Sequence, residues 1–327
     1  MNTIGTALRL TLFGESHGPY VGVVIDGIPA GTPLAAKELL PDLARRQGGR
    51  HAGSTPRAEQ DCPQIVSGLL NGHTTGAPLT LLFANGNLHS QDYDTLRHHY
   101  RPSHADLAAA AKYHGYNDPR GGGMFSGRMT VALVAAGAIA KKLLPDVSFA
   151  TRLTEIGGES DPARFDELLA ELRRRGDSAG GIVEVVARGV ARGVGEPFFV
   201  SVESVAAHLL FSIPGVKGVE FGAGFEAVRR TGSANNDRIA DGSGHTFTNN
   251  DGGINGGIAN GNDIRLRVAF KPTPSIALPQ ETFDARTGTT APLTVGGRHD
   301  ACIALRGAVV AEAALALALA DLSLRRA

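Results

Sequence analysis

The stretch RMTVALVAAGAIAKKLL, residues 128–144, is apolar on nearly every side. A helix that is apolar all round has no solvent face, so we expect this one to be buried on most sides. A second stretch of the same kind, VVAEAALALALADLSLR at 309–325, closes the chain. Its most apolar part, 308–320, is interrupted by Glu312 and is shorter than the roughly 20 apolar residues that span a bilayer. Both stretches therefore predict core helices, and no membrane association.

The two halves of the chain resemble each other weakly around these helices. Each half ends with glycines, an arginine and an apolar helix, at 121–144 and 296–322. This predicts two pseudo-symmetric sheet-and-helix units of the α+β class, with both helices between the sheets, since no parallel βαβ alternation is evident. No linker interrupts 1–327, so we expect one domain. The periodicity places strands at 8–13, 21–25, 64–68, 79–83, 182–188 and 264–270, and further helices at 35–46, 104–113 and 161–175.

The composition argues against several classes of partner. Basic and acidic residues are equal in number, so no field of one sign attracts nucleic acid or an anionic membrane. Cys62 and Cys302 form no CxxC pair and no metal-ligand spacing, which predicts a reducing compartment and no metal site. The N-terminus lacks a basic region followed by an apolar run, so we expect no secretory signal and a cytoplasmic protein.

Two histidines lie in turns that suit acid–base chemistry. His17 lies in GESHG, residues 14–18, between two expected strands. A hydrolase nucleophile elbow requires a helix after the serine, so that interpretation fails, and His17 is either an exposed acid or base or a structural residue. His104 lies in RPSHAD, residues 101–106, at the expected start of a helix, where it is either functional or a surface cap.

Glycine-rich and arginine-rich segments indicate an anion site. The 43 glycines occur in clusters, and the loop GGGMFSGR, residues 121–128, leads directly into the first core helix. The free N–H groups at a helix N-terminus favour phosphate, and Arg128 adds a positive charge. The segment RRQGGR at 45–50 either compensates a helix dipole or binds a phosphate or carboxylate. Asn/Gly loops at 232–237 and 248–257 suit hydrogen bonds to a flavin or a sugar phosphate, and a G-x-G-x-x-A string at 222–227 lacks the context of a nucleotide fold.

Taken together and in order, these motifs resemble the chorismate synthase family. The resemblance runs over about residues 3–322 and rests on GESHG, RPSHAD, the 121–130 loop with its helix, FSIPGVKGVEFG at 211–222, the 250–261 loop, FKPTPS at 270–275 and GRHD at 297–300. It implies a lyase that converts 5-enolpyruvylshikimate 3-phosphate to chorismate by 1,4-elimination of phosphate, in the shikimate pathway of aromatic amino acid biosynthesis. It also implies reduced FMN as cofactor, a β-α-β sandwich and a homotetramer.

The resemblance assigns roles by matching position. His17 corresponds to the acid for the departing phosphate, His104 to a histidine near flavin N1 and the C2 carbonyl, and Asp300 to an aspartate that assists proton removal at flavin N5. Arg46 corresponds to an arginine that contacts the substrate or a nucleotide such as NADP. The further substrate-binding residues implied are Arg50, Arg128 and Arg306, and the flavin-binding residues are Ser126, Ala234, Asn235, Gly256, Lys271, Pro272, Thr273, Pro274, Ser275 and Arg298.

The loop at 121–130 departs from the common family pattern. Met124 and Met129 stand where an arginine and a glutamate are common, which affects the flavin contacts expected at Met124 and Phe125. The chain carries no flavin-reductase module, so an external source of reduced flavin is expected. Two alternatives remain at this stage: a flavin-dependent NAD(P)H oxidoreductase, and a non-catalytic flavin- or anion-binding relative.

Overall fold

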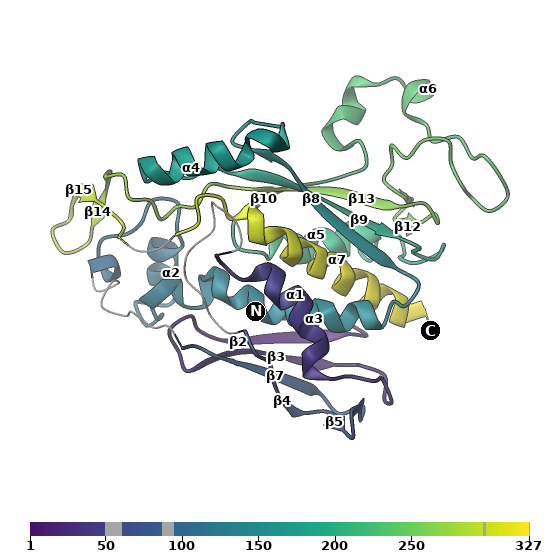
Figure 1. Cartoon of the computed structure of the whole chain (residues 1–327), viewed down its shortest axis with the longest axis horizontal. Coiled ribbons are helices and arrows are strands. Elements are labelled where there is room, and N and C mark those ends of the chain that lie inside the picture. The colour runs from purple at the N-terminus through teal and green to yellow at the C-terminus, as the bar shows by residue number, and fades with distance from the viewer. Residues whose placement is uncertain (50–60, 87–94, 297–298, 327) are drawn as a thin grey trace.

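Two antiparallel sheets enclose a layer of helices in the computed structural model of this protein, as Figure 1 shows. The structure describes residues 1–49, 61–86, 95–296 and 299–326. The helical layer is built mainly from α3 (Thr130–Lys142) and α7 (Ala304–Arg326), the two stretches that are apolar all round. The predicted α+β class and the predicted placement of both helices between the sheets are therefore confirmed.

The first sheet comes from the N-terminal quarter of the chain. Its order is β1 (Thr3–Ile4), β2 (Arg9–Gly14), β3 (Tyr20–Asp26), β7 (Leu79–Ala84) and β4 (Gln64–Ser67). Val21, Val23 and Ile25 of the central strand are fully or almost fully buried, because alternate side chains of a strand point to the same face. That face packs on α3. The turn that carries His17 lies just before this strand in the sequence.

The second sheet covers the other side of the helical layer. Its order is β10 (Val216–Phe221), β13 (Ile264–Phe270), β9 (Gly181–Arg188) and β8 (Ser148–Ile156). Helix α5 (Val202–Phe211) lies beside α7 beneath this sheet, and α4 (Phe165–Arg175) lies over its outer side (Figure 1). The strands β8 and β10 and the helix α5 are elements that the sequence patterns above do not include.

The remaining elements are short and lie around the sandwich. They are α1 (Leu40–Arg46), α2 (Asp106–Lys112), α6 (Gly232–Asn235), the strand pairs β5 (Leu69–Leu70)–β6 (His73–Thr74), β11 (Ile254–Asn255)–β12 (Ile258–Ala259) and β14 (Gln280–Asp284)–β15 (Thr289–Leu293), and 3-10 turns at Ala36–Leu39, Thr95–Arg97, Arg120–Phe125, Gly127–Met129, Pro162–Arg164 and Gly224–Arg229.

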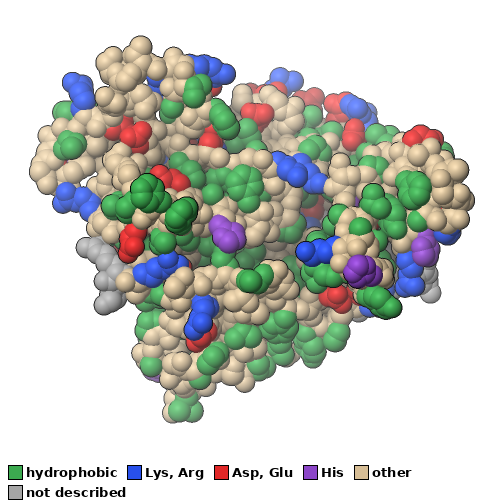
Figure 2. Space-filling view, turned by 180° about the vertical axis from the view of Figure 1, so that it is seen from behind, with side chains coloured by type: hydrophobic (Ala, Val, Ile, Leu, Met, Phe, Trp, Pro, Cys, Tyr) green, Lys and Arg blue, Asp and Glu red, His purple; other side chains and the backbone are tan. Residues whose placement is uncertain are grey.

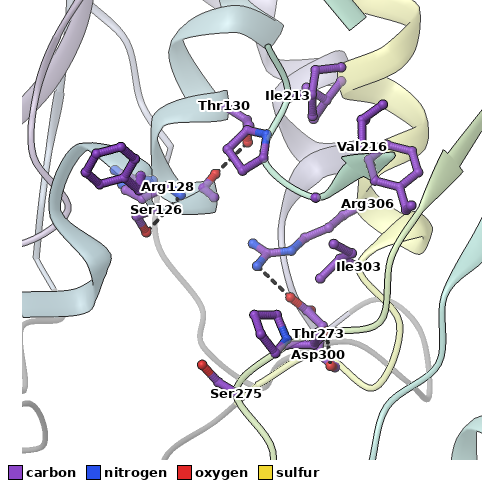
Figure 3. A pocket seen from close by; sticks show the side chains of 18 of the residues that line it. Ser126, Arg128, Thr130, Ile213, Val216, Thr273, Ser275, Asp300, Ile303 and Arg306 are labelled. Atoms are coloured by element: carbon purple, nitrogen blue, oxygen red, sulfur yellow. Dashed lines mark hydrogen bonds and ion pairs between the residues drawn. The ribbon is translucent and has the colours of Figure 1, made fainter. Parts of the chain in front are cut away.

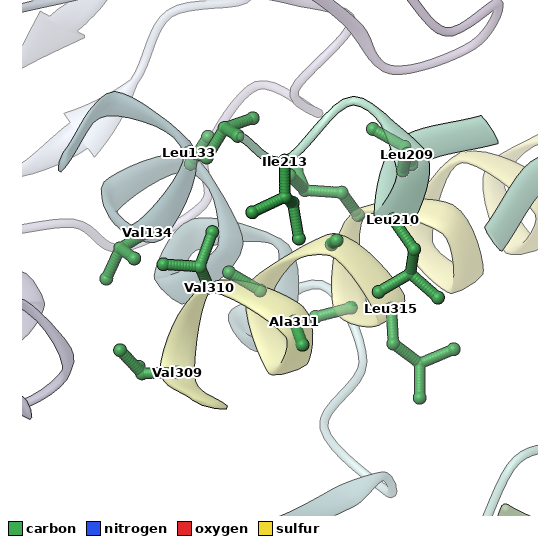
Figure 4. Packing of buried hydrophobic residues seen from close by; sticks show 14 of the residues in the cluster. Leu133, Val134, Leu209, Leu210, Ile213, Val309, Val310, Ala311 and Leu315 are labelled. Atoms are coloured by element: carbon green, nitrogen blue, oxygen red, sulfur yellow. The ribbon is translucent and has the colours of Figure 1, made fainter. Parts of the chain in front are cut away.

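The two core helices approach each other at Gly137. A Cβ atom on Gly137 would lie 2.3 Å from Cβ and 2.6 Å from Cα of Ala313 in α7, so only glycine allows this separation. Buried side chains of α3, α5 and α7 pack against one another in this layer (Figure 4). Helix α7 is long and apolar enough to cross a membrane, but 83% of its apolar window is buried inside the protein, so it is a core helix.

A buried carboxylate lies within this apolar layer. Glu312 of α7 is 2% exposed and accepts hydrogen bonds from Arg45 Nη1 and Nη2, at 2.7 and 2.8 Å, and from Lys141 Nζ. Burial alone would raise the pKa of Glu312, but the two cations outweigh it and hold the pKa below its usual range. The charge in the middle of the apolar stretch is thus explained by partners on α1 and α3.

The contact at Gly137 gives a prediction about stability. Gly137→Ala should destabilise the protein by about 1–3 kcal/mol, because overpacking outweighs the gain of about 1 kcal/mol in helix propensity. Chemical denaturation measures this difference. Gly232→Ala in α6 is the matched control, since a Cβ there meets nothing within 4 Å. A Gly137→Ala protein as stable as the unmodified one would contradict the close approach of the two helices.

Candidate functional site

One cavity of about 960 Å³ opens where α3 and α7 both begin. Thr130 of α3 and Arg306 and Gly307 of α7 line it, so the N-terminal ends of both core helices face the same space. Figure 3 shows Ser126 and Arg128 on one wall, and Arg306 reaching from α7 toward Asp300 on the other. The partial positive charge at the two helix N-termini makes this space favourable for anions.

The glycine loop at 121–123 lies directly against both predicted histidines, His17 and His104. A Cβ on Gly121 would lie 2.4 Å from Cδ2 and 2.6 Å from Nε2 of His17, and a Cβ on Gly122 would lie 3.1 Å from Cε1 of His104. Gly121, Gly122 and Gly123 all have positive φ, which L side chains rarely adopt. The three consecutive glycines therefore let one loop contact two histidines that are distant in sequence. Both His17 and His104 line the cavity.

Two of the predicted arginines share one buried carboxylate. Asp61 is 2% exposed and accepts hydrogen bonds from Arg46 Nη1, at 2.9 Å, and from Arg128 Nη1. Arg46 also donates from Nε to Thr130 Oγ1 and from Nη2 to Gly127 O, and Arg128 Nε donates to Asn85 Oδ1. Buried charges require such partners. Asp61 thus holds both guanidiniums on this wall.

The opposite wall carries a second ion pair. Arg306 Nη2 donates to Asp300 Oδ2 at 2.6 Å, and Thr273 Oγ1 donates to the Asp300 carbonyl oxygen at 2.7 Å (Figure 3). Lys271 Nζ donates to the Ser103 carbonyl oxygen. Partial burial, and then the nearby Lys217, lower the pKa of Lys271. These contacts connect the 271–275 segment with the segment that precedes α7 and with the RPSHAD segment.

The structure brings most of the predicted site residues into this cavity. His17, His104, Asp300, Arg46, Arg128, Arg306, Ser126, Lys271, Thr273, Pro274 and Ser275 all line it, and so do Met124 and Phe125. Pro272 follows a lining residue but does not line the cavity itself. Arg50 and Arg298 lie outside the described residues.

Three predicted flavin-binding residues lie elsewhere in the chain. Ala234 and Asn235 belong to α6, which projects from the rest of the fold in Figure 1, and Gly256 lies in the turn between β11 and β12. None of the three lines the cavity. They share no described contact with His17, His104 or Asp300.

The cavity also contains residues that sequence reasoning left out. Asp61, Arg101, Lys217, Ile213 and Ile303 line it. Arg101 and Lys217 lie within the RPSHAD and FSIPGVKGVEFG strings, so a closer reading of those motifs could have indicated them. Asp61 has no such signal, because its role depends on arginines 15 and 67 positions away.

Charged groups are mixed on the outer surface, in contrast to the cavity. Figure 2 shows Lys and Arg interspersed with Asp and Glu on the face opposite to that of Figure 1. This agrees with the zero net charge of the sequence.

Several large apolar side chains are exposed away from the cavity. They include Phe198, Phe199, Phe225, Val228, Ile239 and Phe247, which are 67–91% exposed.

Comparisons with known proteins agree on one family. The chorismate synthase family model matches residues 8–324. The chain is 54% identical over 325 residues to a chorismate synthase from Chitinophaga pinensis, which covers 99% of this chain and 97% of that protein. It is 45% identical over 345 residues to one from Korarchaeum cryptofilum, covering 97% and 96%. A solved structure described as a crystal structure of chorismate synthase superposes with a TM-score of 0.76 at 30% identity, covering 99% of this chain and 93% of that one.

The glycine loop generates a prediction about activity. Gly121→Ala should lower kcat by about 10–100-fold, because the new Cβ displaces His17 and a shift of about 1 Å has costs of that size. Steady-state kinetics and thermal unfolding, measured together, separate misplacement from misfolding. Gly86→Ala, where a Cβ meets nothing within 4 Å, is the control. Unchanged turnover in Gly121→Ala would show that His17 does not depend on the loop.

Proposed function

The chain belongs to the chorismate synthase family and is a lyase that converts 5-enolpyruvylshikimate 3-phosphate to chorismate and phosphate. We propose that the reaction takes place in the cavity at the start of α3 and α7, with reduced FMN bound beside the substrate. One observation carries the proposal: a single glycine loop contacts two histidines in a space faced by paired arginines and two helix N-termini. The roles below are proposals of the same kind.

The substrate carries two carboxylates and a phosphate, which the cationic walls would bind. Arg128, Arg46 and Arg306 line the cavity from two sides. Each already donates to a protein carboxylate, so the guanidiniums are held in place before a ligand arrives. Arg46 also donates hydrogen bonds to Thr130 Oγ1 and to the Gly127 carbonyl oxygen. We therefore propose that Arg46 attracts the anionic substrate mainly through its positive charge.

The remaining lining fits a flavin. Phe125, Ile213, Pro214, Ile303 and Val310 give an apolar surface suited to a planar ring, and Lys271 offers a cation for a phosphate. A volume of about 960 Å³ lies at the upper end of the roughly 300–1,000 Å³ typical of ligand sites, which leaves room for two ligands. Gly122 keeps open the space beside His104 that a Cβ would fill. We propose that Ser126 and the 271–275 segment hold the flavin. Met124 and Phe125 line the same cavity and add to its apolar surface.

A reduced FMN held by Ser126 and the 271–275 segment would supply transient electron donation to the substrate without net oxidation. The chain's own residues supply proton transfers and charge. We propose that His17 protonates the phosphate oxygen as the C–O bond breaks, which makes phosphate a better leaving group. We propose that Asp300, which is paired with Arg306, would provide the carboxylate that accepts a proton on the flavin side. His104 faces the same space from the other side of the glycine loop.

We further propose that 1–327 is one catalytic domain that assembles into a homotetramer in the cytoplasm and receives reduced flavin from an external source. The exposed apolar side chains near α5 and α6, such as Phe199, Phe225 and Phe247, support burial against another copy. Ala234, Asn235 and Gly256 lie on that side of the chain, so any flavin contact they make would be with a site in a neighbouring subunit.

An anaerobic assay tests the proposed function. Purified protein is mixed with photoreduced FMN and 5-enolpyruvylshikimate 3-phosphate, and chorismate absorbance and phosphate are followed together. We expect equal amounts of both products with reduced FMN and neither with oxidised FMN. Tight flavin binding without product would point to a non-catalytic relative. In a separate mixture of protein, oxidised FMN and NADPH without the substrate, oxidation of NADPH would point to an oxidoreductase.

The proposed role of His17 gives a further prediction. His17→Ala should lower kcat by about 10²–10⁴-fold, the usual contribution of a positioned general acid, with little change in the Kd of FMN. Single-turnover kinetics and flavin titration check both parts. His73→Ala, at an exposed histidine outside the cavity, is the matched control and should behave like the unmodified protein. Unchanged turnover in His17→Ala would rule out the role.

A further inference from the structure

The segment that precedes α2 has a strained turn. Ser103 has a φ of 58°, which is uncommon for a residue other than glycine and costs free energy that the surroundings must offset. Lys271 Nζ donates to the Ser103 carbonyl oxygen, and His104 N donates to the Arg101 carbonyl oxygen at 3.3 Å. The turn directs Arg101 and His104 toward the same side chain, Asp106, the first residue of α2.

Asp106 is held by four donors. Its carboxylate accepts hydrogen bonds from Arg101 N at 3.1 Å, Arg101 Nε at 2.8 Å, Arg101 Nη2 at 2.7 Å and His104 Nδ1 at 2.6 Å. The three side chains are only 4–15% exposed. Burial alone would raise the pKa of Asp106, but the bonds from Arg101 and His104 hold the pKa well below its usual range. Asp106 is therefore ionised and can only accept hydrogen bonds.

An ionised carboxylate at 2.6 Å requires a proton on Nδ1 of His104. Arg101 Nη2 also lies 3.0 Å from Nδ1, but a guanidinium cannot accept, so the acceptor for a proton on Nδ1 is Asp106. Arg101 Nη1 donates to Ser275 Oγ at 3.3 Å, so the guanidinium is fixed on both sides. The nitrogen left for a ligand is Nε2, on the ring edge that contacts Gly122.

From these contacts we infer that Asp106, held by Arg101, is a positioning residue that fixes His104 as the tautomer protonated at Nδ1 and presents Nε2 to the cavity. Asp106 does not line the cavity, so it acts through His104. In neutral His104 the presented Nε2 is an acceptor, and in the imidazolium it is a donor. The inference rests on the proposed function only in taking His104 to act there.

Several charged groups face His104. Arg101 and Asp106 belong to its own segment, Lys271 follows β13, and His299 and Asp300 precede α7. Asp106 is the anion in direct contact with the ring. Replacing it with a neutral residue should destabilise the imidazolium and displace the corresponding limb of the kcat–pH profile toward lower pH.

The direct test is ¹⁵N NMR of the full chain labelled at histidine, with His104→Gln identifying the His104 signals. We expect Nδ1–H in the unmodified protein at a pH where the ring is neutral, and a shift of the proton toward Nε2 in Asp106→Asn. Asp106→Asn should also lower kcat by about 10–100-fold, the size seen when a partner that orients a histidine is removed. The KM should change by less than about threefold, since the substrate contacts remain.

Two further variants separate positioning from folding. Asp284→Asn removes a similarly buried carboxylate that accepts from the backbone and guanidinium of Arg286, outside the cavity, and should leave the His104 signals and the pH profile unchanged. Asp106→Glu keeps the carboxylate and should retain Nδ1–H; it is the variant to read if Asp106→Asn fails to fold.

The inference is overturned if neutral His104 carries its proton on Nε2 in the unmodified protein. It is equally overturned if Asp106→Asn leaves both the tautomer and the pH profile unchanged. An unmodified chain that forms no chorismate would overturn the proposed function instead, and the NMR result would stand apart from that outcome.

Discussion

The close approach of α3 and α7 at Gly137 and Ala313 is the constraint on which the rest of the structure depends. The two helices are apolar on every side, so they can lie only where a sheet covers each outer face. Because both helices begin at the same place, the loops that lead into them meet there. One loop brings the glycines, Ser126 and Arg128, and the other brings Asp300 next to Arg306 in the first turn of α7. The packing of the core thus assembles a site from the segments at 121–128 and 300–306, which are distant in sequence.

Charge compensation is the second principle of this site. Among the described residues, the arginines that line the cavity are each paired with a carboxylate: Asp61 lies between Arg46 and Arg128, Asp106 pairs with Arg101, and Asp300 pairs with Arg306. Unpaired buried charges are costly, so these pairs keep the cations ordered in the absence of a ligand. A site of this kind meets a substrate with three anionic groups with little rearrangement, while the apolar lining remains available to a planar ring.

The sequence allowed the sandwich to be predicted because the all-round apolar stretches at 128–144 and 309–325 have few alternatives. The histidines and the glycine loop could be identified as candidates because their local motifs are distinctive. The strand β8 was missed because Ser148, Ala150 and Arg152 are exposed and weaken its apolar pattern. Helix α5 was missed although Ser201 caps it by accepting a hydrogen bond from Ser204 N. Asp61 and the contact of Gly137 with Ala313 depend on tertiary partners, and no local pattern announces them. Likewise, no local pattern indicates that Ala234, Asn235 and Gly256 lie away from the cavity.

The central claim is that one cavity holds the anionic substrate and the flavin side by side. Isothermal titration of 5-enolpyruvylshikimate 3-phosphate into the protein, with and without saturating oxidised FMN, tests it most directly. The account predicts one substrate site per chain that persists when FMN is bound, and loss of substrate binding in Arg128→Ala with FMN present. Mutually exclusive binding of the two ligands, or unchanged substrate affinity in Arg128→Ala, would contradict it.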